Sequence, residues 1–307
     1  MAFLNALPGA VAQGLIWGLM AIGVYISYKI LDIADLTVDG SICTGGCVCA
    51  LLIAMGVPVW VSVLAALLAG MLTGILTGLL HTALGIPAIL AGILTQLILY
   101  SVNLSILGGK SLMAVDYRST DLLLHMSDNT GAIITAVAVI AMVIVGLWLF
   151  FYTEVGLTLK STGDNPDMSR AQGVNVKLNK VIGLAIANGI VALAGALLTQ
   201  YKGSANINDG RGAIVIALAA IYIGLSVSLK IKPNFVVSLI GVVCGGVVYY
   251  IIYNFVILLG LKTDYLKMLS AIIVAIFLAV PYLKNEYFPK HKPLPVEAEA
   301  TGGDTDA

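Results

Sequence analysis

The sequence predicts an all-α membrane protein, a polytopic helical bundle of about nine transmembrane spans. Of the 307 residues, 60% are hydrophobic and only 10% are charged, whereas soluble domains carry roughly 25% charged residues. A soluble core of this size could not bury so much apolar surface, but a lipid bilayer accepts it. The apolar residues also fall into runs of about 20, the length at which a helix crosses a bilayer.

Nine apolar runs are long enough to be spans. They lie at residues 8–28, 36–55, 57–80, 86–107, 131–152, 178–200, 211–228, 233–258 and 265–283. The second and seventh runs differ from the others, because polar, glycine-containing stretches at 31–41 and 203–212 lead into them. Non-helical backbone at membrane depth is tolerated only where it is buried in protein or lines a cavity. We therefore expect these two spans to be broken or re-entrant.

Basic residues predict the orientation, because cytoplasmic loops carry more Lys and Arg. With nine spans, ten of the 16 Lys and Arg residues fall on one side and six on the other. This places the N-terminus outside and the C-terminus in the cytoplasm. The first basic residue is Lys29, so we interpret the first run as a retained helix, not a cleaved signal peptide. A membrane domain over 1–284 is then followed by a Pro- and Glu-rich tail, 285–307, which we expect to be disordered.

One cytoplasmic segment, residues 153–180, carries clear local signals for a short helix. Asn165 suits the N-cap, where its side-chain oxygen can accept a free backbone N–H. Pro166 suits the first helical position, and Gly173 suits a left-handed C-terminal cap. These residues predict a helix of about two turns over 166–172. So short a helix is marginal alone in water, so it packs against its own protein or a partner; an ordinary amphipathic connector would share the pattern.

Polar residues near the two breaks are candidates for a path through the membrane: Asp39, Ser41, Asn206, Asn208 and Asp209. A carboxylate at the bilayer centre costs about 3 kcal/mol on insertion scales, so such groups face a bundle interior, a water-filled cavity or the headgroups. The alternative is that Asp39 lies at the cytoplasmic interface with Asp32 and Asp35. Three other polar residues lie inside long apolar runs, and we interpret them as interhelical hydrogen bonders: Gln96, Asn103 and Asn188.

The two polar stretches are also similar to each other. Tyr28-Lys29 precedes Asp39-Gly40, and Tyr201-Lys202 precedes Asp209-Gly210. The span assignment places the first pair at the cytoplasmic face and the second pair outside. An inverted pair of this kind predicts broken helices that meet near a central path.

Several kinds of site lack support in the sequence. A P-loop needs Gly-x-x-x-x-Gly-Lys-Ser/Thr, and the nearest match, at 104–111, lacks the first glycine. The three histidines are scattered, and the cysteines of 43–49 lie in a small-residue apolar stretch without further metal ligands. The net charge of zero does not indicate a nucleic-acid partner. We therefore predict no catalytic residues, no metal site and no cofactor bound by this chain.

The 153–180 segment resembles the coupling loop of a known permease superfamily. The residues that carry the resemblance are Gly156, Lys160, Gly163, Asn165 and Pro166, followed by Arg170 and Gly173. They are similar to the loop of the ribose-type and branched-chain amino-acid ABC importer permeases, with Ser161 where alanine is common and Val174 in place of isoleucine. In that superfamily the short helix docks on the ATP-binding subunit and passes its motion to the spans. The resemblance implies that residues 154–176 are the coupling loop.

A second stretch carries the same resemblance. Residues 35–41, Asp-Leu-Thr-Val-Asp-Gly-Ser, are similar to the superfamily's Asp-Leu-Ser-Val-Gly-Ser segment at the second span. Together with 206–210 they resemble the subgroup that is paired with binding lipoproteins for tyrosine, tryptophan or similar amino acids. The resemblance covers about residues 8–284. It implies a non-enzymatic permease subunit in a bacterial cytoplasmic membrane.

The resemblance also implies partners and a cargo. We expect a homodimer that works with separate ATPase subunits, which hold ATP and Mg²⁺, and with an external substrate-binding lipoprotein. The expected cargo is a small amino acid, with an aromatic one as a candidate. Three alternatives stay open: a sugar or nucleoside permease of the same superfamily, a stand-alone secondary transporter that would use Asp39 or Asp209 as its coupling carboxylate, and a sensory or scaffold membrane protein that would bind without transport.

Overall fold

The computed structural model describes residues 2–115, 122–124, 129–231 and 234–258, together with residues 268, 271, 272, 275 and 279. Its elements in chain order are α1 (Ala2–Tyr25), the π-helical turn η1 (Ile26–Ile30), α2 (Val38–Ala54), α3 (Val59–Thr82), α4 (Ala88–Ile106), β1 (Leu112–Ala114), α5 (Asn129–Phe151), α6 (Glu154–Asp164), α7 (Pro166–Ala171), α8 (Val176–Lys202), β2 (Ser204–Asn206), α9 (Ala213–Ile231) and α10 (Phe235–Leu258). The two short strands pair antiparallel. The described part of the chain is thus mainly helical, as predicted.

Six of these helices are long and apolar enough to cross a membrane: Ala6–Ile30, Val59–Thr82, Ala88–Ile106, Asn129–Phe151, Val176–Lys202 and Phe235–Ile257. Two further apolar helices, Val38–Ala54 and Ala213–Ser226, are shorter. The helical membrane class is confirmed. The count of nine spans stays a prediction, because the run at 265–283 lies almost wholly outside the described residues, as does the tail at 285–307.

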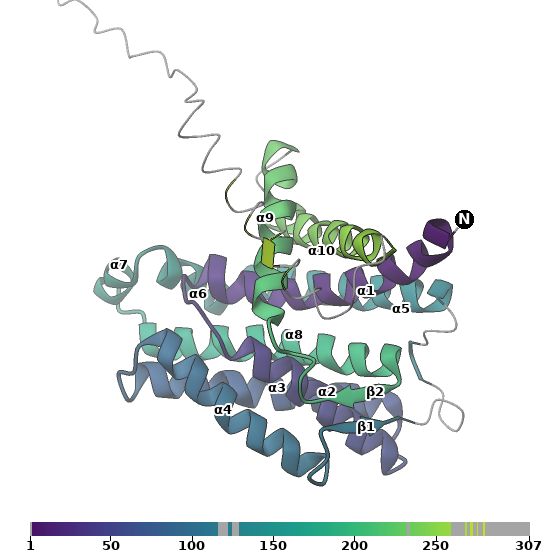
Figure 1. Ribbon diagram of the computed structural model, residues 1–307. Helices are drawn as coiled ribbons and strands as arrows, with labels where there is room; N and C mark the ends of the chain where they lie inside the picture. The colour runs from purple at the N-terminus through teal and green to yellow at the C-terminus, as the bar shows by residue number, and fades with distance from the viewer. Residues whose placement is uncertain are drawn as a thin grey trace, which may run out of the picture.

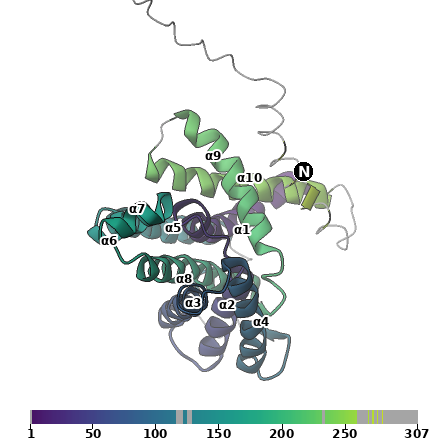
Figure 2. The ribbon, with the colours of Figure 1, turned by 90° about the vertical axis from the view of Figure 1, so that its left-hand side faces the viewer.

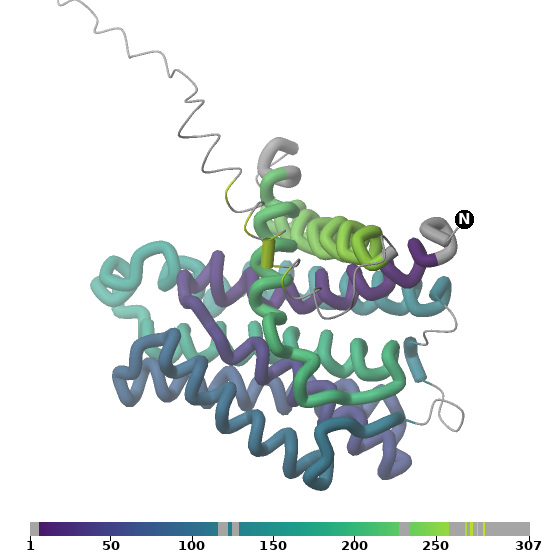
Figure 3. The backbone as a smooth tube through the Cα atoms, in the orientation of Figure 1, coloured from purple at the N-terminus to yellow at the C-terminus, as the bar shows by residue number. Residues whose placement is uncertain are grey.

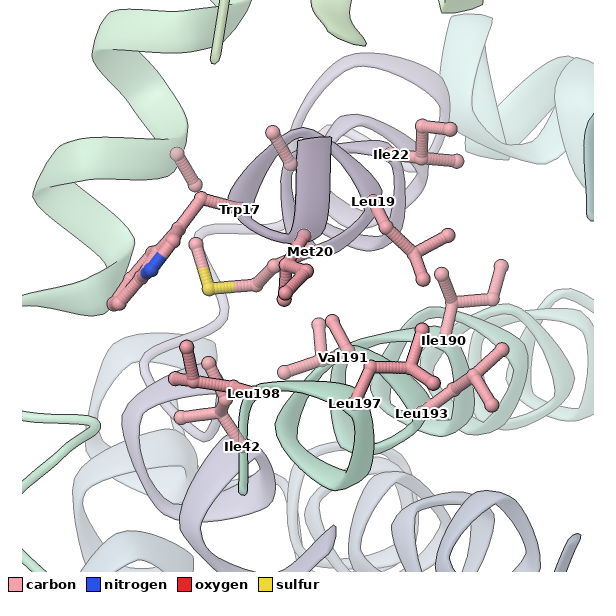
Figure 4. Packing of buried hydrophobic residues seen from close by; sticks show 14 of the residues in the cluster. Trp17, Leu19, Met20, Ile22, Ile42, Ile190, Val191, Leu193, Leu197 and Leu198 are labelled. Atoms are coloured by element: carbon pink, nitrogen blue, oxygen red, sulfur yellow. The ribbon is translucent and has the colours of Figure 1, made fainter. Parts of the chain in front are cut away.

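Helices α1 and α8 form the centre of the bundle (Figure 1). α8 packs against α1, α2 and α3, while α1 packs also against α5, α9 and α10. The end view in Figure 2 shows α2, α3 and α4 on one side of this centre, and α9 and α10 on the other. At the α1–α8 contact, Leu19 and Met20 point toward Val191 and Leu197 (Figure 4), and all four side chains are fully buried.

Glycines spaced four residues apart allow the closest helix contacts. Gly70, Gly74 and Gly78 follow one face of α3, and a Cβ on any of them would collide with α8. Gly14 and Gly18 of α1 lie in the same way against α10. Lipid provides no hydrophobic driving force between helices. Membrane helices therefore associate through close packing, which small residues allow because the backbones can approach each other.

The same contacts give the helix directions. Gly74 lies against Leu184 and Gly78 against Val181, so α3 and α8 are antiparallel. α2, joined to α3 by a short turn, runs in the same direction as α8. α10 is antiparallel to both α1 and α9, as the pairs Gly18–Val243 and Gly224–Gly241 indicate when taken with their neighbours.

Two non-helical segments interrupt the bundle near its middle. Residues 31–37 lead from η1 to α2, and residues 207–212 return from β2 to the start of α9 (Figure 3). At the first break Asp32 has φ of 53°, a left-handed conformation that Asp adopts more readily than most residues. The predicted interruption at 203–212 is therefore present, whereas the one predicted at 31–41 covers only 31–37, because 38–41 already belong to α2. Re-entry of either segment into a membrane stays a prediction.

Candidate functional site

The short helix predicted in the 153–180 segment is present as α7, with the caps that the sequence indicated. The Asn165 side chain accepts a hydrogen bond from the backbone N–H of Met168 at 3.0 Å, and Pro166 occupies the first turn. Gly173 has φ of 83° and follows the last turn, as expected of a left-handed cap. The helix ends at Ala171, one residue before the predicted end.

The structure corrects the reading of this segment as one short helix, because α6 precedes α7. α6 spans 11 residues, and the Thr153 hydroxyl caps it by accepting from the N–H of Gly156 at 3.3 Å. Threonine is a favoured N-cap residue, and Glu154 follows it in the first turn. These two signals were available in the sequence. Our prediction used the Asn-Pro signal at 165–166 and missed the earlier start.

The two helices attach firmly to the end of α1 and the start of α8. A Cβ on Gly163 would collide with the carbonyl of Ile30, and Leu159 is fully buried near Gly183. The Asn179 side chain of α8 donates to the Thr162 hydroxyl at 3.1 Å. These contacts tie α6 to η1, which leads directly into the break at 31–37.

The outer face of α7 is open. Met168 is 59% exposed, and Arg170 and Asp167 form an exposed ion pair at 3.3 Å. An exposed pair of this kind contributes at most about 1 kcal/mol, so it does not hold the helix in place. Lys160 points elsewhere: it lines a cavity of about 590 Å³ between α1, α5, α6 and α10, together with Lys29 and Asp164.

Asp39 joins the two broken segments. It stands in the first turn of α2, and its carboxylate accepts the backbone N–H of Gly212 and of Ile214, each at 3.0 Å. Its own backbone carbonyl lies so close to Gly210 that a Cβ there would collide with it. The carboxylate thus satisfies free N–H groups at the start of α9 and opposes the positive end of that helix. The N-termini of α2 and α9 meet at this residue.

A second carboxylate, Asp35, lies fully inside the protein at the first break. One oxygen accepts the N–H of Thr37 at 2.9 Å, and the other accepts the side-chain amide of Asn188 at 2.6 Å. The Asn188 oxygen in turn accepts the Ser41 hydroxyl at 2.6 Å, and Ser41 bonds to Thr73 at 2.7 Å. Among the described residues Asp35 has no cationic partner. These bonds hold the break against α3 and α8.

A chain of hydroxyl groups extends the network to α4. Thr37 bonds to Thr77 at 2.7 Å, and Thr77 donates to Thr95 at 3.0 Å. All three side chains are buried. Side-chain hydrogen bonds between helices are a common means of association where water is absent.

The structure separates the residues proposed for a path. Asp39 lines a cavity, but Ser41 is buried in the network with Asn188. Asn206 is in β2 opposite Leu112, where its side chain accepts the N–H of Asn208. Asp209 forms an ion pair with Lys202 at 3.0 Å. None of these last three lines the cavity next to Asp39.

The interhelical hydrogen bonders were predicted with mixed success. Asn188 is one, as its bonds to Asp35 and Ser41 confirm. Asn103 is not, because its buried side-chain oxygen has no partner. Gln96 lines the cavity beside Asp39 instead. Position within an apolar run shows that a polar group is enclosed, but it does not show whether the group faces a helix or a cavity.

The described residues contain no group of His, Cys, Asp or Glu that could hold a metal ion. What they do contain is an exposed helix pair at one end of the bundle, attached to a break that bears a buried carboxylate, and a second break bonded to the first through Asp39.

Comparisons with known proteins place the chain in a family. Residues 7–279 match the family described as branched-chain amino acid transport system / permease component. The chain is 34% identical over 277 residues to a tyrosine transport system permease protein of Clostridioides difficile, covering 90% of this chain and 91% of that protein. It is 30% identical over 285 residues to an uncharacterised protein of Rickettsia prowazekii, covering 92% and 99%.

Similarity to sugar permeases is more limited. A ribose import permease protein of Escherichia coli is 26% identical over 152 residues, which is 49% of this chain and 46% of that protein. No solved structure matches the chain significantly. The family match covers most of the chain, including both breaks and the α6–α7 segment. The chain therefore belongs to the family of branched-chain amino acid transport system permease components, which are ABC-type permeases.

Proposed function

We propose that this chain is the membrane subunit of an ATP-driven importer in a bacterial cytoplasmic membrane. It works as a homodimer with two ATPase subunits and an external substrate-binding lipoprotein. It spans the membrane nine times, with the N-terminus outside and α6–α7 in the cytoplasm. Its cargo is a small amino acid, and an aromatic one is the favoured candidate. The large exposed apolar side chains of α3, α4 and α5, such as Leu72, Leu90 and Met142, suit contact with lipid.

The observation that carries this proposal is the attachment of α6 to the first break. The open face of α7, with Met168 and Arg170, is the docking surface for the ATPase. Motion of α6 reaches the carbonyl of Ile30 through Gly163, and the break at 31–37 continues from there to Asp39. Asp39 then connects to the start of α9. ATP-driven movement at one end is thereby transmitted to both broken segments.

A second connection joins the same parts. The hydroxyl groups of Tyr28, in η1, and Tyr222, in α9, are 2.8 Å apart. η1 thus contacts α9 through this hydroxyl pair and α6 by packing. π-Helical turns occur often at functional sites, where they allow local adjustment of a helix. The end of α1 is the hinge through which the proposed motion passes.

The bonds that Asp39 and Asp209 already make disfavour the alternative of a stand-alone secondary transporter. Such a protein needs a carboxylate in the membrane that is free to bind a coupling ion. Both oxygens of Asp39 accept backbone N–H groups, and Asp209 is paired with Lys202. The amino-acid cargo, as opposed to a sugar, is supported by similarity along 90% of the chain to a protein named for tyrosine transport. Similarity to the ribose permease spans only about half.

Co-purification tests the importer class directly. The tagged chain is solubilised gently from its native membranes, and the proteins that accompany it are identified by mass spectrometry. We expect a stoichiometric ATPase subunit. A folded chain that comes out reproducibly alone, and that transports in proteoliposomes with an ion gradient and no ATP, would contradict the proposal.

The docking surface has its own test. Arg170→Glu should reduce ATP-driven uptake of tyrosine into proteoliposomes by about tenfold or more, since charge reversal at a docking surface is strongly unfavourable. The matched control is Lys110→Glu, which makes the same change at an exposed residue between α4 and β1. Both variants should reach the membrane in normal amounts. Equal uptake by the two variants would refute the assignment of α7 as the docking helix.

A further inference from the structure

A groove of about 420 Å³ opens beside the junction of the two breaks. Its polar lining comes from three parts of the chain: Asp39 and Cys43 of α2, Gln96, Tyr100 and Asn103 of α4, and Arg211 of the segment before α9. Its volume falls within the ~300–1,000 Å³ that is usual for small-molecule sites. Ile93 and Leu97 of α4 add apolar wall.

The groove lies halfway along the bundle. Gln96 is near the middle of the 19-residue helix α4, and a Cβ on Gly40 would lie 3.3 Å from its Cα. Asp39, which precedes Gly40, is therefore far from both ends of this apolar helix. A charged residue in such a position is costly, about 2.5–3.5 kcal/mol on insertion scales, and generally serves a function.

Arg211 is the charged group without a partner here. Across the residues that the structure describes, the ion pairs are Arg170–Asp167 and Lys202–Asp209, and the Arg211 guanidinium takes part in neither ion pair nor hydrogen bond. Asp39 does not neutralise it, because the Asp39 oxygens accept two backbone N–H groups at the start of α9. A guanidinium fits a carboxylate through two parallel hydrogen bonds. The groove thus offers an unused site for a carboxylate.

Asn103 supplies an independent indication of a ligand. It is 1% exposed, and its side-chain oxygen has no hydrogen-bond partner although it is buried. Leaving a buried acceptor unpaired costs about 1–3 kcal/mol, so a buried orphan on a cavity wall suggests a donor that arrives with a ligand. An ammonium or hydroxyl group can be that donor.

We propose that this groove binds the transported solute as a zwitterionic α-amino acid, with Arg211 as the ligand of its carboxylate. The ammonium group donates to the Asn103 oxygen. The side chain lies along Tyr100 and the apolar wall of α4. This assignment rests on the proposed importer function and specifies its cargo, because a neutral sugar or nucleoside would leave Arg211 unpaired.

The first test measures the charge preference of the groove without any cargo. Leu97, which lines the groove and is 64% exposed, is changed to cysteine in a Cys43→Ala, Cys244→Ala background, because Cys43 is a native thiol of the groove lining and Cys244 is the exposed native thiol among the four. Labelling rates are compared for an anionic and a cationic methanethiosulfonate reagent of similar size. We expect the anionic reagent to label about tenfold faster than the cationic one. Arg211→Gln should abolish this difference in labelling rate. Equal rates with and without Arg211 would overturn the proposal.

The second test measures transport. The importer, reconstituted with its ATPase and loaded binding protein, takes up tyrosine with ATP. Arg211→Gln should lower the maximal rate by about tenfold or more, since a charge-assisted contact is lost, whereas Lys202→Gln, a matched neutralisation of a residue outside the groove lining, should change it by less than about twofold. Binding to the external protein is saturated in both, so its own preference for carboxylates does not affect the comparison.

The two tests separate failure of the inference from failure of the proposed function. If the wild-type importer carries tyrosine and Arg211→Gln carries it equally well, the groove assignment is wrong and the function stands. If the wild-type importer carries a sugar and no amino acid, the proposed cargo is wrong, and the assignment of the groove to an α-amino acid falls with it. Arg211→Lys should retain part of the rate, because it keeps the charge but not the two parallel bonds.

Discussion

The hydrogen bond between Asp35 and Asn188 should be the strongest polar contact between helices in the described part of this bundle. It joins the first break to α8 at 2.6 Å with both side chains buried. The perturbation is a double-mutant cycle of Asp35→Ala, Asn188→Ala and the combined variant. Such a cycle isolates the energy of the pair from the other losses that each substitution causes.

The magnitude depends on the charge of Asp35. A hydrogen bond to an ionised group contributes about 1.5–3 kcal/mol, whereas neutral side-chain bonds between membrane helices average about 0.6 kcal/mol. The structure offers a neutral reference in the same network, the Thr77–Thr95 bond at 3.0 Å. A parallel cycle of Thr77→Val and Thr95→Val should therefore give a coupling energy several times smaller than that of Asp35 and Asn188.

Both cycles are measured by equilibrium unfolding of the purified protein in mixed micelles, with increasing fractions of a denaturing detergent. Free energies of unfolding for the four proteins of each cycle give the two coupling energies. A coupling energy for Asp35–Asn188 that equals the Thr77–Thr95 value would refute the reasoning. It would mean that Asp35 is neutral inside the protein or that the geometry is not maintained in solution.

Two further predictions concern the connections of the breaks. Asp39→Ala leaves the N–H groups of Gly212 and Ile214 without their acceptor, which should cost about 1–3 kcal/mol per group and lower the melting temperature of the solubilised protein; an unchanged melting temperature would contradict the capping role. Gly163→Val places side-chain atoms against the Ile30 carbonyl, so the reconstituted importer should hydrolyse ATP with little uptake. The control is Gly146→Val, whose Cβ meets open space and whose uptake should stay normal.

Local signals explain the parts that the sequence predicted well. The caps of α7 depend on Asn165, Pro166 and Gly173, which act within a few residues of their own helix. The apolar runs depend on composition over about 20 residues, so eight of the nine predicted runs correspond to helices in the described chain. The breaks followed from polar and glycine-containing stretches. α6 was not predicted, because its Thr153 cap lacks the following proline that marks the start of α7.

The sequence by itself determined the helical membrane class, the position of the breaks and the ends of α7, because each depends on neighbouring residues. Only the tertiary structure decided which polar groups meet. Asp39 bonds to residues more than 170 positions later, and Asp35 to Asn188 across 153 positions. Arg211 and Asn103 line one groove although nothing in their local sequence relates them. Such contacts arise from close packing at glycines of several helices, and periodicity along a single helix carries no information about them.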